Sequence, residues 1–385
     1  MSALTGFKRS DGRWGFRNHV LVLPLHQVLS NTAREVEGLV DGAVAVSHDW
    51  SGEVDSDFER IAKVLAGIAN NPNNFATIFL TVGTPIETEI ITRSRSLGAT
   101  ELHVLSLSEL GSMTALLAHA TNLATQLTQK ATAVVRVDAP MSAIVLGLEC
   151  GGSDAYSGIT ANPALGLASD RLVAQGATSI LAETMEILGS EHLLAARAIT
   201  PEVGKQIIDV VARYERSISY EGIDIRGAQP SRGNIEGGLS TLEEKSLGAA
   251  KKAGSAQFTG VLEYADTPPT PGLYFMDTPG HDIEQLTAFA GAGVNITVFT
   301  TGRGTPTGSA VMPTIKVATN SEMGLVLTDL IDLNAGTISD GVQTLDEVGD
   351  LIYQEILDVA NGKLAKAEIN GQHEFNLSRL YGSTL

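Results

Sequence analysis

Two glycines flanked by groups that can bind metals or transfer protons make up the segment ECGGSD at residues 149–154. Glycines let a backbone approach a ligand closely, and the N–H groups of such a turn can bind a carboxylate or a phosphate. Carboxylate and thiol groups beside the turn are suited to bind a metal ion or to transfer protons. The alternative is a tight turn in which the thiol is a small buried apolar group. The residues predicted to bind substrate here are Gly151, Gly152, Ser153 and Asp154, and those predicted to bind a metal are Glu149 and Cys150, with Cys150 also a candidate catalytic residue.

Three carboxylates and one imidazole follow within the segment ETMEILGSEH at residues 183–192. Together these groups suit Fe²⁺, Mn²⁺ or Zn²⁺, and they also suit general base catalysis. We predict that Glu183 is both a metal ligand and a catalytic residue and that His192 is catalytic. The alternative is that Glu186 and Glu191 are solvated charges at helix ends.

An arginine between two glycines occurs in the segment TTGRGTP at residues 300–306. The guanidinium fork of an arginine can bind a substrate carboxylate through two hydrogen bonds, and the alternative here is an ion pair with a structural aspartate. The glycine-containing segment at residues 233–238 is similar in kind, and the lysine at position 245 is either a base, a charge stabiliser or a solvated helix residue. The residues predicted to bind substrate are Arg303, Thr301, Gly302 and Asn234, and the predicted catalytic residue is Lys245.

Two further features involve basic side chains. His48 directly follows a predicted strand and is a candidate metal ligand, although a lone histidine is more often structural or on the surface. Arg9, Arg13 and Arg17 precede the first predicted strand in a chain of net charge −18. They are expected either to bind an anion or a neighbouring subunit, or to form ion pairs that clamp the terminus.

Strands and helices alternate along the whole chain, which indicates an α/β fold. We predict two domains, 1–135 and 136–385, each with a largely parallel sheet flanked by helices in a Rossmann-like, doubly wound arrangement. Residues 217–238 are expected to be a long functional loop. Ligands bind at the carboxyl ends of the strands in such sheets. The loops expected there are 47–52, 82–85, 149–157, 183–186, 277–280 and 300–308, and they hold most of the residues singled out above.

Composition narrows the classes of function. The acidic net charge argues against nucleic acid and anionic membranes as partners. The N-terminus lacks an apolar signal core and no apolar run is long enough to span a membrane, so we expect a cytoplasmic protein. With one cysteine, Cys150, the chain cannot form an internal disulfide or hold a usual iron–sulfur cluster. The glycine spacing matches neither a P-loop nor a nicotinamide-binding fingerprint.

Six segments resemble the altronate and galactarate dehydratases. The resemblance extends over nearly the whole chain, so we expect the chain to belong to that family. The segments are GFKRSDGRWGFRN at residues 6–18, LGLECGGSDAYSGITANPALG at 146–166, ETMEILGSEHLLAAR at 183–197, GNIEGGLSTLEEKSLG at 233–248, GLYFMDTPG at 272–280, and FTTGRGTPTG with PTIKVATN between 299 and 320.

The resemblance implies a lyase that requires Fe²⁺, Mn²⁺ or another divalent metal and acts on a small-molecule carboxylate, a 2,3-dihydroxy acid. The C2 proton is removed, the C3 substituent leaves, and the resulting enol becomes a 2-oxo acid. The metal would act as a Lewis acid, and side chains would serve as base and acid.

Two departures from the dehydratase pattern are evident. Family dehydratases carry a small N-terminal domain of about 100 residues, which implies a separate small subunit here and an oligomeric enzyme. They also carry cysteines after the first three strands, where this chain has residues 26–30, 48–52 and 83–87 without cysteine. Both departures, and the tail at residues 373–381, also resemble the large subunit of (R)-sulfolactate sulfo-lyase, which expels sulfite and leaves pyruvate. We predict a sugar-acid dehydratase, with the sulfo-lyase and an inactive sugar-acid-binding paralogue as alternatives.

Overall fold

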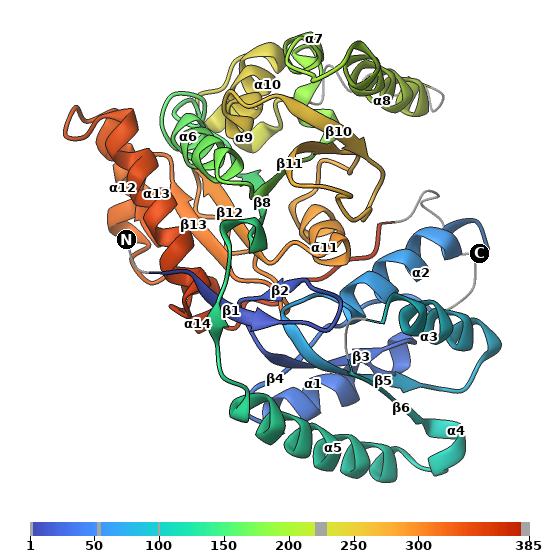
Figure 1. The fold of residues 1–385 in the computed structure, drawn as a ribbon. Coiled ribbons are helices and arrows are strands. Elements are labelled where there is room, and N and C mark those ends of the chain that lie inside the picture. The colour runs from blue at the N-terminus through green and yellow to red at the C-terminus, as the bar shows by residue number, and fades with distance from the viewer. Residues whose placement is uncertain (1–2, 52–54, 99–100, 220–228, 379–385) are drawn as a thin grey trace.

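Two parallel sheets, one in each half of the chain, form the framework of the molecule (Figure 1). The computed structural model describes residues 3–51, 55–98, 101–219 and 229–378. The predicted α/β class with parallel, helix-flanked sheets is confirmed. Parts of three predicted segments, at positions 52, 220–228 and 379–381, lie outside the described residues.

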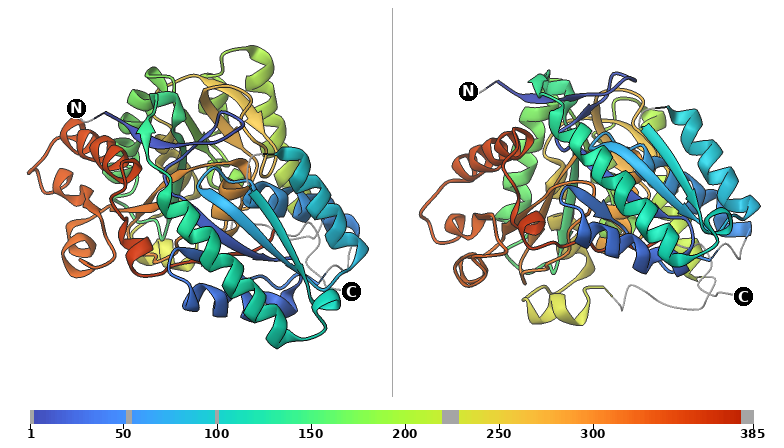
Figure 2. Two further views of the ribbon diagram at one scale, coloured as in Figure 1. Left: turned by 60° about the horizontal axis from the view of Figure 1, so that its bottom comes forward. Right: turned by 90° about the horizontal axis from the view of Figure 1, so that it is seen from below.

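The first sheet has four parallel strands in the order β4-β3-β5-β6. Helices α1 and α5 pack on one face, and α2 and α3 cover the other, as the views in Figure 2 show. The strands of this half are β3 (His19–Pro24), β4 (Ala43–Ala45), β5 (Asn74–Thr81) and β6 (Glu101–Ser106), and the helices are α1 (Ser30–Leu39), α2 (Asp55–Ala69), α3 (Pro85–Leu97), α4 (Leu107–Leu110) and α5 (Met113–Ala133).

The second sheet has seven parallel strands in the order β10-β11-β9-β8-β12-β13-β14. Its strands are β8 (Val145–Gly151), β9 (Thr178–Leu181), β10 (Phe258–Leu262), β11 (Gly272–Met276), β12 (Ile296–Thr301), β13 (Thr314–Ala318) and β14 (Leu333–Asn334). After β8 the chain forms β9, β10 and β11 on one side of that strand, and it then returns to form β12 on the other side. The strand order therefore reverses beside β8, which is where open α/β sheets bind ligands.

The helices of the second half cover both faces of this sheet. Helices α6 and α13 pack on one face and α11 on the other. The long elements are α6 (Ala161–Ala174), α8 (Pro201–Ser219), α10 (Leu242–Ala250), α11 (Asp282–Ala292) and α13 (Leu345–Ala360), and the short ones are η3 (Thr184–Ile187), α7 (Glu191–Ala195), α9 (Arg232–Glu236), η5 (Lys251–Ala253), α12 (Ser321–Val326) and α14 (Lys366–Ile369). Helix α9 lies inside the segment expected to be a loop. No described helix is long and apolar enough to cross a membrane.

Helices α2 and α11 join the two halves between their sheets. A Cβ atom on Gly67 of α2 would lie 2.1 Å from the backbone oxygen of Gly291 in α11. A side chain at this position would push the helices apart, so the glycine allows their backbones to approach. The apolar cluster around this contact includes residues from both sheets and fixes one half against the other.

A small antiparallel sheet at the N-terminus was not predicted. It consists of β2 (Trp14–Gly15), β1 (Thr5–Lys8) and β7 (Val137–Asp138), so it spans the predicted boundary between the domains. The basic cluster beside it clamps the terminus. Arg17 pairs with Glu368 at 2.7 Å, Arg9 donates to the Pro72 carbonyl at 2.6 Å, and Arg13 pairs with Asp11 at 2.5 Å.

Candidate active site

A cleft of about 510 Å³ opens at the carboxyl ends of β8, β9 and β12 and before α11. Four of the six predicted loops contribute to its walls, namely those that follow β8, β9, β11 and β12. The loops at 47–52 and 82–85 belong to the other sheet and do not line it. The ionisable side chains in its walls include Cys150, Glu183, Glu186, Lys245, Asp282 and Arg303.

A buried network of one thiol, two carboxylates and two lysines borders the cleft. The Lys252 ammonium donates to the Cys150 sulfur at 2.9 Å and lies 3.3 Å from Glu183 Oε2. The Cys150 thiol donates to Glu186 Oε2 at 3.1 Å. The Lys245 ammonium pairs with Glu186 Oε1, also at 3.1 Å, so Glu186 links the two lysines. These five side chains are at most 9% exposed.

Charges within the network set its protonation states. Burial favours neutral carboxyls, but the ammonium groups of Lys245 and Lys252 lower the pKa of Glu186 to about 2. Burial likewise disfavours a charged lysine, yet the Glu186 carboxylate raises the pKa of Lys245. Burial raises the pKa of the Cys150 thiol well above its ordinary value. At neutral pH the cleft therefore holds an ionised carboxylate next to an ammonium group and a protonated thiol.

Three carboxylates gather beside this network. Oxygen atoms of Glu149, Glu183 and Asp282 lie within 4.8 Å of one another. Both oxygens of Glu149 are buried and have no hydrogen-bond partner among the described residues. Burial and the nearby charges of Glu183 and Asp282 raise the pKa of Glu149 well above its ordinary value. A buried carboxylate without a donor is costly, so this group of oxygens is suited to a cation.

The backbone at Glu183 holds a left-handed conformation, with φ of 68°. Such a conformation is uncommon for a residue with a side chain and persists only where its surroundings impose it. The Glu183 N–H donates to the Thr278 hydroxyl at 2.8 Å, and the Thr184 N–H donates to the Thr278 carbonyl at 3.1 Å. The turn after β9 is thus fastened to the loop after β11, which carries Asp282 into the cleft.

The paired glycines bring the end of β8 close to the neighbouring loops. A Cβ atom on Gly151 would lie 2.1 Å from Asp282 Oδ2, and Gly152 has φ of 61°. A side chain at either position would be excluded by contact or by strain. The glycines therefore allow the Asp282 carboxylate to approach the Cys150–Gly152 backbone.

Arg303 and Asn234 lie at the mouth of the cleft. The Arg303 guanidinium is 46% exposed; it donates to the Gly233 carbonyl at 2.6 Å and lies 3.3 Å from Glu236. The Asn234 amide donates to the Ser153 carbonyl at 2.9 Å, which joins α9 to the glycine turn. The short helix α9 thus closes one side of the cleft and holds the arginine there.

Several predicted site residues lie elsewhere. His192 is exposed on α7, and His48 is in the other half, with Nε2 2.7 Å from the Pro24 carbonyl. The Asp154 carboxylate accepts from Ser157, Thr319 and Asn320 and holds its own loop together. Thr301 and Gly302 are absent from the cleft walls; the Thr301 hydroxyl accepts from two backbone N–H groups of the following turn.

Three residues in or beside the cleft were not among the predicted site residues. Glu186 was considered only as a solvated charge at a helix end, but it is 7% exposed because two lysines pair with it. Lys252 follows Lys245 by seven residues, two helical turns, and this spacing could have indicated a common face. Asp282 follows a loop that was singled out, but no pattern in its segment distinguishes it from an ordinary helix-start aspartate.

Comparison with known families accounts for almost the whole described chain. The sequence model "D-galactarate dehydratase/Altronate hydrolase, second domain" matches residues 6–132. The model "D-galactarate/Altronate dehydratase, C-terminal" matches residues 141–383. The chain belongs to the galactarate/altronate dehydratase family. The residues of the cleft, from Cys150 to Arg303, all lie within the C-terminal region of this family.

Relatives within the galactarate/altronate dehydratase family carry different names. The chain is 34% identical to (2R)-sulfolactate sulfo-lyase subunit beta of Chromohalobacter salexigens, over 98% of this chain and 97% of that protein. It is also 34% identical to altronate dehydratase of Bacillus subtilis, over 95% of this chain and 75% of that protein. It is 44% identical to galactarate dehydratase (L-threo-forming) of Escherichia coli, over 59% of this chain and 43% of that protein. Identity therefore assigns the family and leaves its two reaction types open.

Proposed function

We propose that the chain is the catalytic subunit of a metal-dependent hydro-lyase that removes water from a sugar acid such as altronate or galactarate and forms a 2-keto-3-deoxy acid. The observation that carries this proposal is the cleft at the end of β8. It combines unpartnered buried carboxylate oxygens, an ammonium group at Lys245 and a guanidinium at Arg303. An elimination next to a carboxylate needs these same elements, namely a Lewis acid site, a proton donor and an anion-binding group.

The carboxylates Glu149, Glu183 and Asp282 fit a divalent cation. Their oxygens converge, and Glu149 has no donor that would otherwise neutralise it. A second possible donor set, Cys150 with Glu183 and Glu186, shares Glu183 with the first and is less suited, because Lys252 donates to the Cys150 sulfur and Lys245 pairs with Glu186. We therefore place Fe²⁺, or Mn²⁺ in its stead, at the first set. When bound there, the metal would supply Lewis acidity that makes the C2 proton of the substrate easier to remove.

The ion pair between Glu186 and Lys245 handles the two protons of the elimination. The C2–H bond breaks and its proton passes to the ionised Glu186 carboxylate. The C3–O bond breaks, and the Lys245 ammonium gives a proton to the departing hydroxyl, which leaves as water. The enol that remains converts to the 2-oxo acid. Lys245 is protonated before the reaction because Glu186 raises its pKa, which suits it to be the acid and not the base.

Arg303 binds a carboxylate of the substrate at the mouth of the cleft. Its guanidinium is held by one backbone carbonyl and one exposed carboxylate, so it retains free donors toward the cleft. Gly151, Gly152 and Ser153 line the cleft nearby. A sugar acid with several hydroxyls matches this polar lining better than an apolar ligand would.

The second candidate function is the elimination of sulfite from (R)-sulfolactate with formation of pyruvate. The observation in its favour is the alignment with a sulfo-lyase beta subunit over nearly the full length of both chains. The name of that relative also supports the proposal that this chain assembles with a separate small subunit. Both candidate reactions use the same removal of a C2 proton and differ in the group that leaves from C3.

An anaerobic assay distinguishes these functions. The chain is supplied with Fe²⁺, with and without a co-expressed small partner, and is offered altronate, galactarate and sulfolactate while 2-oxo acid and sulfite are measured together. A 2-oxo acid without sulfite supports the dehydratase, and equal amounts of pyruvate and sulfite support the sulfo-lyase. If neither product forms with metal bound and partner present, the enzyme assignments fail for this panel. The chain is then better described as a sugar-acid-binding paralogue.

A further inference from the structure

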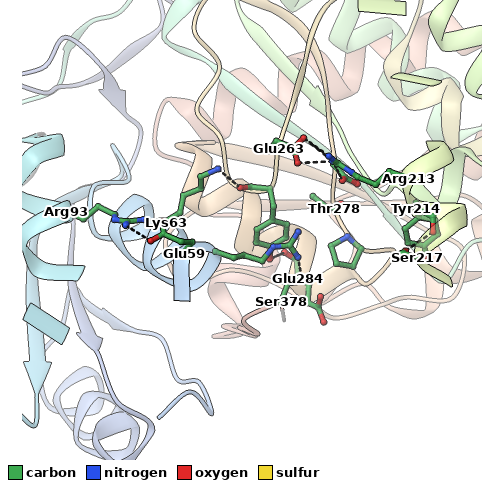
Figure 3. A pocket seen from close by; sticks show the side chains of 14 residues that line it. Glu59, Lys63, Arg93, Arg213, Tyr214, Ser217, Glu263, Thr278, Glu284 and Ser378 are labelled. Carbon is green, nitrogen blue, oxygen red and sulfur yellow. Dashed lines mark hydrogen bonds and ion pairs between the residues drawn. The ribbon is translucent and has the colours of Figure 1, made fainter. Parts of the chain in front are cut away.

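A second cavity lies behind the candidate active site, between the two halves of the chain (Figure 3). Its volume is about 800 Å³, and it is lined by side chains from α2, α3, α8 and the loop after β11. That loop separates the two cavities, because Asp277 and Thr278 line this one whereas Gly280 and Asp282 line the cleft. A group that faces the second cavity is therefore within one loop of the candidate metal ligands.

Asp277 bridges this cavity and the turn that carries Glu183. One oxygen of its carboxylate accepts a hydrogen bond from the Thr184 hydroxyl, and Thr184 is fully buried. The other oxygen pairs with the guanidinium of Arg213 at 2.5 Å. Arg213 is 48% exposed and also forms a two-pronged pair with Glu263, as Figure 3 shows. Asp277 is thus held on one side by a cation and itself holds the residue next to Glu183.

We infer that Asp277 is a positioning residue for Glu183, and that Arg213 fixes Asp277 in turn. The inference rests on the proposed function in one respect, since it treats Glu183 as a metal ligand. The left-handed backbone of Glu183 needs external restraint. Thr278 restrains the backbone N–H groups of Glu183 and Thr184, and Asp277 restrains the Thr184 side chain. Without this side-chain anchor, the turn relaxes and the Glu183 carboxylate leaves the group formed with Glu149 and Asp282.

Glu263 and Thr184 provide matched variants. Thr184→Val removes the hydroxyl with little change of shape, whereas Thr184→Ser keeps it. Asp277→Ala removes the anchor, whereas Glu263→Gln weakens the other partner of Arg213 and leaves Asp277 in place. All four are made in the full chain, and Mn²⁺ without substrate is the metal probe.

Two measurements test the inference. We expect Thr184→Val and Asp277→Ala to increase hydrogen exchange at the N–H groups of residues 183 and 184 more than tenfold, and to weaken Mn²⁺ binding about 10- to 100-fold, as for other residues that orient metal ligands. Thr184→Ser and Glu263→Gln should match the unaltered protein in both measurements. If Asp277→Ala does not fold, Thr184→Val alone decides. Unchanged exchange in Thr184→Val would overturn the inference. If the unaltered protein binds no Mn²⁺, the proposed metal site is wrong. Hydrogen exchange at residues 183 and 184 still tests the positioning role in that case.

Discussion

Glu149 and Lys316 lie on the same face of the seven-stranded sheet, one on each side of Phe299. Phe299 pairs with Glu149 on β8 and with Lys316 on β13, so the three side chains form a row across neighbouring strands. The Lys316 ammonium lies 3.3 Å from the centre of the Phe299 ring. Within the described part of the chain, neither the ammonium nor the carboxylate has a hydrogen-bond partner. An acidic and a basic side chain are thus buried beside the cleft and separated by an aromatic ring.

Lys316 should make the stability of the metal-free protein depend on pH. Burial lowers its pKa from 10.5 to about 7, so between these values the unfolded chain binds a proton that the folded chain does not. Stability then rises with pH by about 1.4 kcal/mol per pH unit, and it is lost as the pH falls through this window. Lys316→Met should lack this slope. Urea unfolding of both proteins across the window measures it, and parallel curves would show that the amine keeps an ordinary pKa.

Glu149 should be needed for metal binding and not for folding. Glu149→Gln retains the size of the side chain but removes a negative charge from the set formed with Glu183 and Asp282. We expect the affinity for Mn²⁺ to fall at least about 100-fold, since a metal ligand is lost and not merely reoriented. The free Mn²⁺ signal in electron paramagnetic resonance measures binding directly. Glu191→Gln, on the short helix α7 and outside the cleft, is the control; an equal loss in both variants would contradict the assignment.

Lys245 should be required for the chemical step. Lys245→Met removes the ammonium group that pairs with Glu186 and faces the cleft. Loss of a general acid lowers kcat by about 10²- to 10⁴-fold, and we expect KM to change much less. Steady-state kinetics on the substrate identified by the panel checks this. Lys251→Met changes an exposed neighbour and should retain activity. A normal kcat in Lys245→Met would show that another residue is the general acid.

Arg303 should govern substrate affinity. Arg303→Met is expected to raise KM about 10-fold or more, because a charge-assisted hydrogen bond to a carboxylate contributes about 1.5–3 kcal/mol. Arg303→Lys should recover part of this affinity, since a lysine keeps the charge but not the planar fork. Arg34→Met alters an exposed guanidinium on α1, in the other half of the chain, and serves as the control. The idea fails if KM is unaltered while kcat falls, which would place Arg303 in the chemical step.

The alternation of strands and helices was predictable because each buried strand is a short apolar run between polar helix surfaces. The apolar run FATIFLTV at residues 75–82, for example, coincides with β5 (Asn74–Thr81). The N-terminal sheet was missed because β2 and β7 have two residues each, too few to show any period. Helix α9 was missed because its five residues contain only one apolar side chain.

The candidate site could be predicted as a set of loops but not as a set of contacts. Glycines, carboxylates and Arg303 follow strand ends, and the carboxyl ends of parallel strands meet at one edge of the sheet. Which charges pair there depends on tertiary distances that no local pattern contains. Glu186 and Glu191 are alike in the sequence, yet Glu186 lies between two lysines and Glu191 does not line the cleft. His192 and Glu183 differ in the same way: Glu183 lines the cleft and His192 does not, although both lie in one short segment.

The sulfur of Cys150 also gives this protein a built-in reporter. It is the single cysteine among 385 residues, and it lies where Lys252 and Glu186 meet. A thiol-specific label or a mercury derivative therefore reacts at Cys150 alone. The vibrational signal of the S–H group likewise comes from this one residue, without background from elsewhere in the chain. The speed of labelling would follow the opening of the lysine–carboxylate network in real time, and a ligand in the cleft would slow it even when no product forms.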